Sequence, residues 1–338
     1  MRCAVCRSLC TVYGISKAYS TEDVALMKKV ACVGILVADI IVEPVTSYPE
    51  KGLLLPVNSI TLHNGGNAMT ASINLKKLGV ETTMIGKVGG DVFGSFLRDK
   101  LVSAGVNTAG LKTDENVQTS ASVLMLDKTG ERSFFHCVGT NAVFSEKDID
   151  YSLIEDCDLV FVTGSFLLNT FDGVETMEFL KKCKEMGKTT FLDVCWDASG
   201  KWGELLNMSM PYIDYFMPSI DEAVCIAKKD DVEDIAEEFF KNGAKNVVIK
   251  MGSKGSFLRR NTDEKGQIFP ICKGVTAVDT TGAGDSFCSG FLAAFARDCS
   301  LEECMRFANG TGAHCVMEKG ATTGIKSYEE ILDFVNKQ

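Results

Sequence analysis

The sequence predicts an α/β fold in which helices cover both faces of a mostly parallel sheet. Short apolar runs alternate with amphipathic helical stretches through most of the 338 residues, and this is typical of doubly buried strands joined by helices. The expected strands are residues 30–36, 82–86, 159–163, 190–194, 215–217 and 247–250. The expected helices include residues 68–78, 92–104, 174–186 and 232–241. This order favours parallel strands with crossover helices.

The composition indicates a globular protein with an acidic surface. Hydrophobic residues make up 46% of the chain, which is enough for a buried core. The formal charge of −10 argues against a nucleic-acid or anionic-membrane partner. No apolar run approaches the roughly 20 residues that span a bilayer. We therefore expect a cytoplasmic protein, and we expect most of its 14 cysteines to be reduced core residues.

Residues 1–26 are predicted to be an N-terminal extension without stable structure. From Met27 onward the sequence runs directly into the first expected strand. Scattered basic residues leave an organelle-targeting segment as an alternative. Cys3, Cys6 and Cys10 have a spacing that could hold a metal, but no nearby His or Cys supplies a fourth ligand. The folded domain is expected to cover residues 27–338.

Two segments lack the helical pattern and are expected to form a small β-sheet. They are residues 43–62 and 117–138. Within the second, residues 120–126 and 132–136 flank a short polar turn and indicate a hairpin. Helix-free pieces from two separate places can meet as an appendage on the main sheet. Such an appendage predicts a lid over a binding site.

The stretch from Val278 to Phe287 predicts a phosphoryl-transfer site. Gly282, Ala283 and Gly284 carry little or no side chain, so their N–H groups can approach an anion where a helix begins. Asp285 follows that turn and could accept a proton from an attacking hydroxyl. The alternative is an ordinary glycine-rich turn with an acidic residue in the first helical turn.

Residues 279–287 read Asp-Thr-Thr-Gly-Ala-Gly-Asp-Ser-Phe and resemble the second signature of the ribokinase-like carbohydrate kinases, also called the PfkB family. Residues 65–68 and 86–94 resemble the first signature, and the resemblance covers roughly residues 28 to 336. It implies a ribokinase-like fold whose β lid covers the sugar and often pairs with a second subunit in a homodimer. It also implies ATP-dependent phosphorylation of a hydroxyl on a small sugar or polyol.

The resemblance also assigns roles around the acceptor and the transferred phosphoryl group. It implies that Asp285 is the general base and that the turn of Gly282, Ala283 and Gly284 is the anion hole. The substrate-binding residues that it implies are Asp39, Gly65, Gly66 and Asn67. Asn67 could instead cap the following helix. Thr70 stands where many family members carry an Asn, so one sugar contact of those members has no counterpart here.

The nucleotide and metal roles are likewise implied by resemblance. The expected nucleotide-binding residues are Lys250, Gly252, Gly255, Thr281 and Asn309. Glu222 is expected to hold Mg²⁺ of the nucleotide, with Ser219 where the family typically has Asn. Read from the residues alone, the glycines fit a turn and the Ser219–Glu222 pair fits a helix capping box. A monovalent cation such as K⁺ would leave no side-chain signature.

Asp197 bears on the substrate class. Some members that act on acidic sugars carry Arg at this position. An Asp repels a carboxylate or phosphate, so an uncharged sugar is favoured. Two other functions stay open: a nucleoside kinase, for which the sequence shows no clear run of base-stacking aromatics, and a non-catalytic sugar-responsive binding protein on the same fold.

Overall fold

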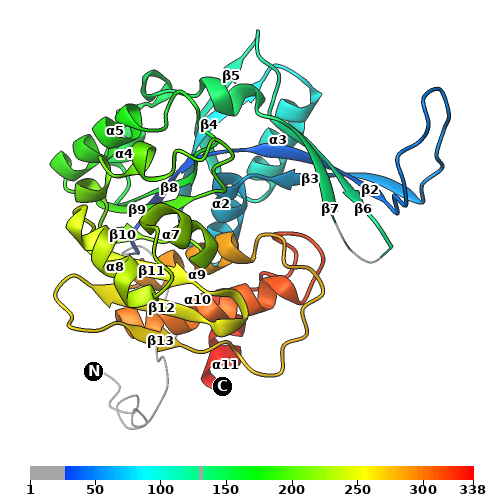
Figure 1. The fold of residues 1–338 in the computed structure, drawn as a ribbon. Helices are drawn as coiled ribbons and strands as arrows, with labels where there is room; N and C mark the ends of the chain where they lie inside the picture. The colour runs from blue at the N-terminus through cyan, green and yellow to red at the C-terminus, as the bar shows by residue number, and fades with distance from the viewer. Residues whose placement is uncertain (1–26, 129–131) are drawn as a thin grey trace, which may run out of the picture.

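The computed structural model describes residues 27–128 and 132–338, so the predicted extension 1–26 lies outside the described residues. The main body is a nine-stranded sheet in the order β13-β12-β11-β10-β9-β8-β1-β4-β5 (Figure 1). Its strands are β1 (Val30–Gly34), β4 (Thr82–Gly89), β5 (Asn107–Asp114), β8 (Leu159–Ser165), β9 (Thr189–Val194), β10 (Tyr215–Phe216), β11 (Asn246–Lys250), β12 (Ser256–Arg260) and β13 (Gln267–Phe269). All neighbouring pairs are parallel except β11–β12 and β12–β13, which confirms the predicted architecture.

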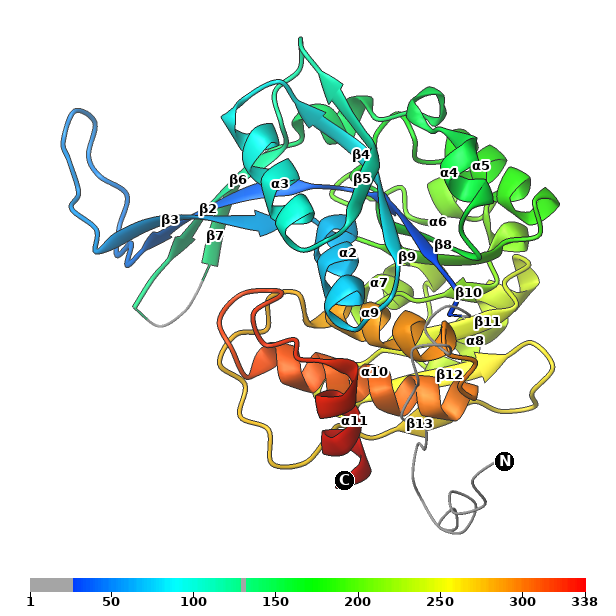
Figure 2. The ribbon, with the colours of Figure 1, turned by 180° about the vertical axis from the view of Figure 1, so that it is seen from behind.

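Helices cover both faces of this sheet (Figures 1 and 2). One face carries α4 (Tyr151–Glu155), α5 (Val174–Glu185), α7 (Ile220–Ala227) and α8 (Val232–Lys241). The other carries α2 (Asn67–Lys77), α3 (Val92–Ser103), α9 (Ala283–Phe295), α10 (Leu301–Val316) and α11 (Tyr328–Asn336). Short helical turns are α6 (Gly203–Leu206), η1 (Gly139–Val143), η2 (Glu146–Asp148), η3 (Met210–Tyr212) and η4 (Gly252–Lys254).

The two hydrophobic cores follow from the alternation of side chains along each strand. In β1, Val30 and Cys32 pack into the core under α2 and α9, whereas Ala31 and Val33 pack into the core under α5 and α8. All four side chains are fully buried, as expected for a strand inside a parallel sheet. Because neighbouring strands here are parallel, their carboxyl ends lie at the same edge of the sheet.

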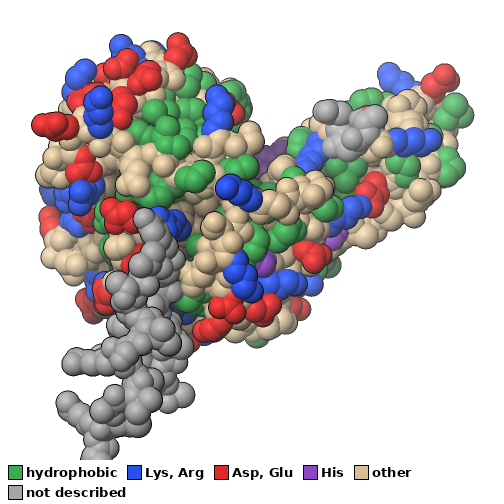
Figure 3. Space-filling model, turned by 90° about the horizontal axis from the view of Figure 1, so that it is seen from below, with side chains coloured by type: hydrophobic (Ala, Val, Ile, Leu, Met, Phe, Trp, Pro, Cys, Tyr) green, Lys and Arg blue, Asp and Glu red, His purple; other side chains and the backbone are tan. Residues whose placement is uncertain are grey.

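The small sheet has the order β3-β2-β6-β7 and projects from the main body (Figures 1 and 3). Its strands are β2 (Val37–Glu43), β3 (Ser59–Gly65), β6 (Ala121–Leu126) and β7 (Arg132–Cys137). The predicted segment 43–62 therefore begins too late, because the chain leaves the main sheet after Gly34. A Cβ atom on Gly34 would lie 1.9 Å from the carbonyl oxygen of Thr163, so only glycine permits this close exit.

Two further sequence predictions concern the membrane and the cysteines. Over residues 27–128 and 132–338, the structure contains no helix with the length and apolarity needed to traverse a bilayer. Cys183, Cys288, Cys304 and Cys315 are buried and unbridged, as predicted for reduced core thiols. The cysteines considered as metal ligands, Cys3, Cys6 and Cys10, lie outside the described residues.

Candidate active site

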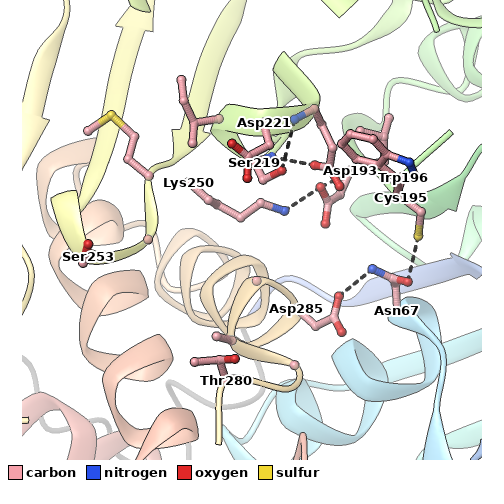
Figure 4. A pocket seen from close by; sticks show the side chains of 18 residues that line it. Asn67, Asp193, Cys195, Trp196, Ser219, Asp221, Lys250, Ser253, Thr280 and Asp285 are labelled. Atoms are coloured by element: carbon pink, nitrogen blue, oxygen red, sulfur yellow. Dashed lines mark hydrogen bonds and ion pairs between the residues drawn. The ribbon is translucent and has the colours of Figure 1, made fainter. Parts of the chain in front are cut away.

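A cavity of about 590 Å³ opens at the carboxyl ends of β9, β10 and β11, opposite the N-termini of α2 and α9 (Figure 4). An open α/β sheet presents its ligand crevice at this edge. Eight predicted site residues line the cavity: Asn67, Glu222, Lys250, Gly252, Gly282, Ala283, Gly284 and Asp285. Residues far apart in the chain therefore meet as the sequence predicted.

Asp285 lies in the first turn of α9, and its carboxylate faces the cavity. Asn67 Nδ2 donates a hydrogen bond of 2.8 Å to Asp285 Oδ1 (Figure 4). Burial raises the pKa of Asp285 to about 7, and the negative charge of Asp193 adds to the rise. A carboxyl group with this pKa changes its protonation state near neutral pH, which suits a general base.

The backbone hydrogen bonds at the start of α9 show which N–H groups are available to bind an anion. Gly282 adopts the left-handed conformation, with φ 74°, and is the residue that precedes the helix. The N–H of Ala283 donates to the Thr280 carbonyl, and the N–H of Ser286 donates to the Gly282 carbonyl. Between them, the N–H groups of Gly284 and Asp285 are the orphan donors of the first helical turn. The helix dipole also favours an anion there.

A buried ion pair stands beside this turn. Lys250 Nζ lies 2.6 Å from Asp193 Oδ1, and the Asp193 side chain is 1% exposed. Burial raises the pKa of Asp193 to about 6 although Lys250 opposes the rise, and Asp193 raises the pKa of Lys250 against the effect of burial. A Cβ atom on Gly284 would lie 3.6 Å from Lys250 Nζ, so the ammonium group borders the anion turn.

Asp193 has no role in the sequence predictions. The signal available for it was its place at the carboxyl end of β9, where charged side chains face the ligand crevice. Its pairing with Lys250 depends on β9 and β11 lying on either side of β10. That neighbourhood is a property of the sheet order, which local sequence does not specify.

Asn67 faces the cavity instead of capping α2. The residue before the helix is Gly66, and no side chain caps this end. Cys195 Sγ donates to Asn67 Oδ1 at 3.1 Å, and this fixes Nδ2 as the group that faces Asp285. The capping alternative for Asn67 is therefore wrong, because both polar atoms of its amide bond other partners.

Asp39 and Gly65 lie where the small sheet joins the main body, outside the residues that line the cavity. A Cβ atom on Gly65 would lie 1.9 Å from Asp39 Oδ2, so the carboxylate rests on the backbone two residues before Asn67. Burial raises the pKa of Asp39 to about 6, against a hydrogen bond from Ser122 that lowers it. A Cβ atom on Gly66 would lie 2.6 Å from the Ile35 carbonyl oxygen, so this glycine allows close backbone packing.

Glu222 lines the cavity and also caps α7. Its Oε2 accepts a hydrogen bond of 2.7 Å from the Ser219 N–H, and Ser219 Oγ accepts from the Glu222 N–H at 3.4 Å. The predicted capping box is therefore confirmed. The capping box uses one carboxylate oxygen, Oε2, so a second role for the other oxygen is compatible with it.

Three predicted nucleotide residues, Gly255, Thr281 and Asn309, do not line the cavity. Thr281 Oγ1 accepts from Arg132 Nη1 at 2.7 Å. Asn309 Nδ2 donates to the Phe269 carbonyl at 3.3 Å, and a Cβ atom on Gly255 would lie 2.0 Å from that same oxygen. Their nucleotide contacts stay predictions. Gly252 does line the cavity, and its φ of 56° explains why a glycine occupies this position.

The position of Asp197 bears on the predicted substrate class. Its carboxylate accepts hydrogen bonds from the N–H groups of Ser199, at 2.8 Å, and Trp202, at 2.6 Å. The side chain thus bonds its own loop and is not among the residues that line the cavity. The preference for an uncharged acceptor that was inferred from Asp197 stays a prediction.

Comparisons with known proteins give a matching family and a matching fold. The sequence model for "pfkB family carbohydrate kinase" matches residues 27–327. A ribokinase of Haemophilus influenzae is 27% identical over 321 residues, which cover 92% of this chain and 99% of that relative. The structure of Arabidopsis thaliana ribokinase complexed with ribose and ATP superposes with a TM-score of 0.79 at 25% identity, covering 91% and 99% of the two chains. A nucleoside kinase of Methanocaldococcus jannaschii, at 23% identity, shares the fold with a TM-score of 0.77 over 92% and 99%.

The two glycines of the anion turn should respond differently to alanine. In Gly282→Ala the new Cβ atom would lie 2.4 Å from Ala321 Cβ at a residue with φ 74°, so we expect a loss of about 1–3 kcal/mol in the free energy of unfolding. In Gly284→Ala the nearest atom would be 3.6 Å away, so stability should be unchanged or slightly higher. Urea denaturation of both variants checks this, and equal losses would contradict the geometry of the turn.

Proposed function

The chain belongs to the pfkB family of carbohydrate kinases, and we propose that it transfers the γ-phosphoryl group of ATP to a hydroxyl of a small neutral sugar or polyol. The observation that carries this proposal is the Asp285 carboxylate, which faces the cavity beside an anion-binding helix start and has a pKa of about 7. Phosphoryl transfer to an alcohol needs both groups side by side: a base for the hydroxyl and donors for the phosphate oxygens.

The proton transfer follows from the two oxygens of Asp285. Asn67 occupies Oδ1 and orients the carboxylate. Oδ2 then accepts the proton of the acceptor hydroxyl while the hydroxyl oxygen bonds to the γ-phosphorus. The bond from that phosphorus to the bridging oxygen breaks, and ADP leaves. A base with pKa near the working pH is effective because about half of it is ionised and it still binds a proton well.

Negative charge on the transferred group is balanced by the start of α9 and by Lys250. The N–H groups of Gly284 and Asp285 point their partial positive charge at the phosphoryl oxygens. The Lys250 ammonium borders the same turn and is oriented by Asp193. Removing Asp193 would therefore remove one carboxylate from the cavity and would also disturb the position of the Lys250 ammonium group.

The cavity also offers carboxylates for the Mg²⁺ that accompanies ATP. Asp221 and Glu222 line it, and the capping box occupies only Oε2 of Glu222. These hard oxygen ligands fit Mg²⁺, which keeps several of its waters. When bound, Mg²⁺ would neutralise charge on the phosphates. Glu222 would hold it directly or through water.

The charges in the cavity favour an uncharged substrate. Among the described residues that line the cavity, Lys250 is the only cation, and it is paired with Asp193. Asp39 and Asn67 instead offer hydrogen-bonding groups that suit hydroxyls. A sugar acid would leave its carboxylate without a cationic partner there.

We also propose that two copies pair through the small sheet, which has two different faces. Asp39 and His63 pair across the strands on the face that carries the sugar-binding Asp. The opposite face carries Ile60, Leu62 and Phe135, whose exposed fractions are 66%, 38% and 60%. Exposed apolar faces of this kind mark interaction surfaces. Pairing in a homodimer would bury them while leaving the Asp39 face toward the cavity.

A panel of acceptors tests the substrate class. With ATP and Mg²⁺, neutral sugars and polyols should show higher kcat/KM than sugar acids and sugar phosphates, because the described residues that line the cavity include no unpaired cation. ADP release and phosphorylated product are measured together, so that hydrolysis of ATP by water is counted separately. A best substrate with a carboxylate or phosphate would contradict the neutral acceptor but not the kinase.

The pH dependence tests Asp285 as the base. The active form is the ionised carboxylate, and its pKa is about 7. At limiting ATP and acceptor, kcat/KM should therefore fall about tenfold per pH unit below pH 7 and level off above it. A profile that stays flat from pH 8 down to pH 5 would show that no group with the pKa of Asp285 limits the reaction.

A further inference from the structure

Three aromatic rings meet at one end of the cavity, and together we call them the aromatic platform: Phe166, Trp196 and Trp202. The Trp196 and Trp202 rings are 5.2 Å apart at 85°, and the Phe166 and Trp202 rings are 5.5 Å apart at 80°. Trp196 lines the cavity and is 59% exposed (Figure 4). Edge-to-face contacts thus support an indole that remains available for a ligand.

The loops that carry the platform are strained and held by carboxylates. Phe166 has φ 79° and Trp202 has φ 41°, values that bulky residues rarely adopt. The Phe166 N–H donates to Asp172 Oδ1 at 2.9 Å, and the Trp202 N–H donates to Asp197 Oδ2 at 2.6 Å. Backbone strain of this kind persists where the surroundings enforce it and concentrates at ligand sites. The loops and their hydrogen bonds therefore hold the rings of the platform in place.

The platform is connected to the residues proposed to hold the acceptor. Trp196 follows Cys195, whose thiol donates to Asn67 Oδ1 at 3.1 Å. The amide of Asn67 in turn donates to Asp285. Trp196, Asn67 and Asp285 all line the same cavity. The exposed indole therefore borders the space in which the acceptor would lie.

The site also sits where the strand order reverses. The chain places β4 on one side of β1 and β8 on the other. In open α/β sheets this switch point is where ligands bind, outside the carboxyl ends of the strands. Phe166 directly follows β8 at this point. The platform and the acceptor residues thus share one crevice.

We propose that the acceptor is a sugar that carries an aromatic ring through a glycosidic bond, and that this ring stacks on Trp196. The proposal rests on the kinase function above and specifies its substrate. An aromatic ring joined to the sugar supplies a flat face that can stack on the Trp196 indole, which is exposed within the cavity. A nucleobase and an aryl group supply the same chemistry to this contact.

The test compares matched acceptors and matched variants. The acceptors are the methyl and phenyl glycosides of the best sugar in the panel, together with ribose and adenosine. The variants are Trp196→Ala, Trp196→Phe and the control Ile268→Ala, whose side chain is also 59% exposed but lies on the edge strand β13. Kinetics of phosphorylation and calorimetric titration without ATP are measured for each.

The wild-type protein should prefer ring-bearing acceptors about tenfold or more in kcat/KM. Trp196→Ala should lower this value by about ten- to a hundredfold for ring-bearing acceptors, with less than a twofold change for the free sugar. Trp196→Phe should keep part of the preference, and Ile268→Ala all of it. Higher activity with the phenyl glycoside than with adenosine would identify an aryl group as the source, and the reverse a nucleobase.

Two outcomes would overturn the proposal: no preference for ring-bearing acceptors in the wild-type protein, or an equal loss for both acceptor classes in Trp196→Ala. If no acceptor is phosphorylated, the kinase proposal fails, and calorimetry still decides the platform. Binding of phenyl glycoside or adenosine that is lost in Trp196→Ala supports it. Absent binding, or binding that the substitution leaves unchanged, refutes it.

Discussion

The hydrogen bond between Asn67 and Asp285 joins the two halves of this site. Asn67 begins α2 at the acceptor end, and Asp285 lies in the first turn of α9 at the phosphate end. A second link joins the same helices about two turns further along α2, where Asn74 Nδ2 donates to Ser286 Oγ at 3.0 Å. The two helices thus meet along polar as well as apolar contacts. This contact therefore fixes the position of Asp285, the proposed base, relative to the start of α2.

A surplus of negative charge around one buried cation sets the chemistry of the cavity. The carboxylates of Asp193, Glu222 and Asp285 line the cavity together with Lys250, which pairs with Asp193. Burial and the neighbouring carboxylates raise the pKa of Asp285, while Lys250 and the Asn67 amide oppose that rise. Removing one partner of a buried ion pair is costly because the other charge remains. The same arrangement that orients Lys250 therefore also adjusts the base.

The sequence predicted those parts of the site that are local in the chain. Gly282 and Asp285 belong to one turn, and the Ser219–Glu222 capping box joins positions three apart. The sequence did not predict a role for Asp193, whose partner Lys250 is 57 residues away. It also did not predict the aromatic platform, because those rings meet only when the strained loops that carry them are folded. In the fold, six of the parallel strands were predicted, but β5, β12 and β13 of the main sheet and the early start of the small sheet at Val37 were not.

The central claim is that Asp285 takes the proton of the acceptor hydroxyl. The most direct measurement compares Asp285→Asn with the wild-type protein in single-turnover phosphorylation of the best acceptor, with ATP affinity determined by calorimetry. The substitution keeps the shape and removes the base, so the rate should fall by roughly 10² to 10⁴ while ATP binding is largely kept. Near-normal phosphorylation by Asp285→Asn would contradict the claim and leave Asp285 as a charge at a helix start.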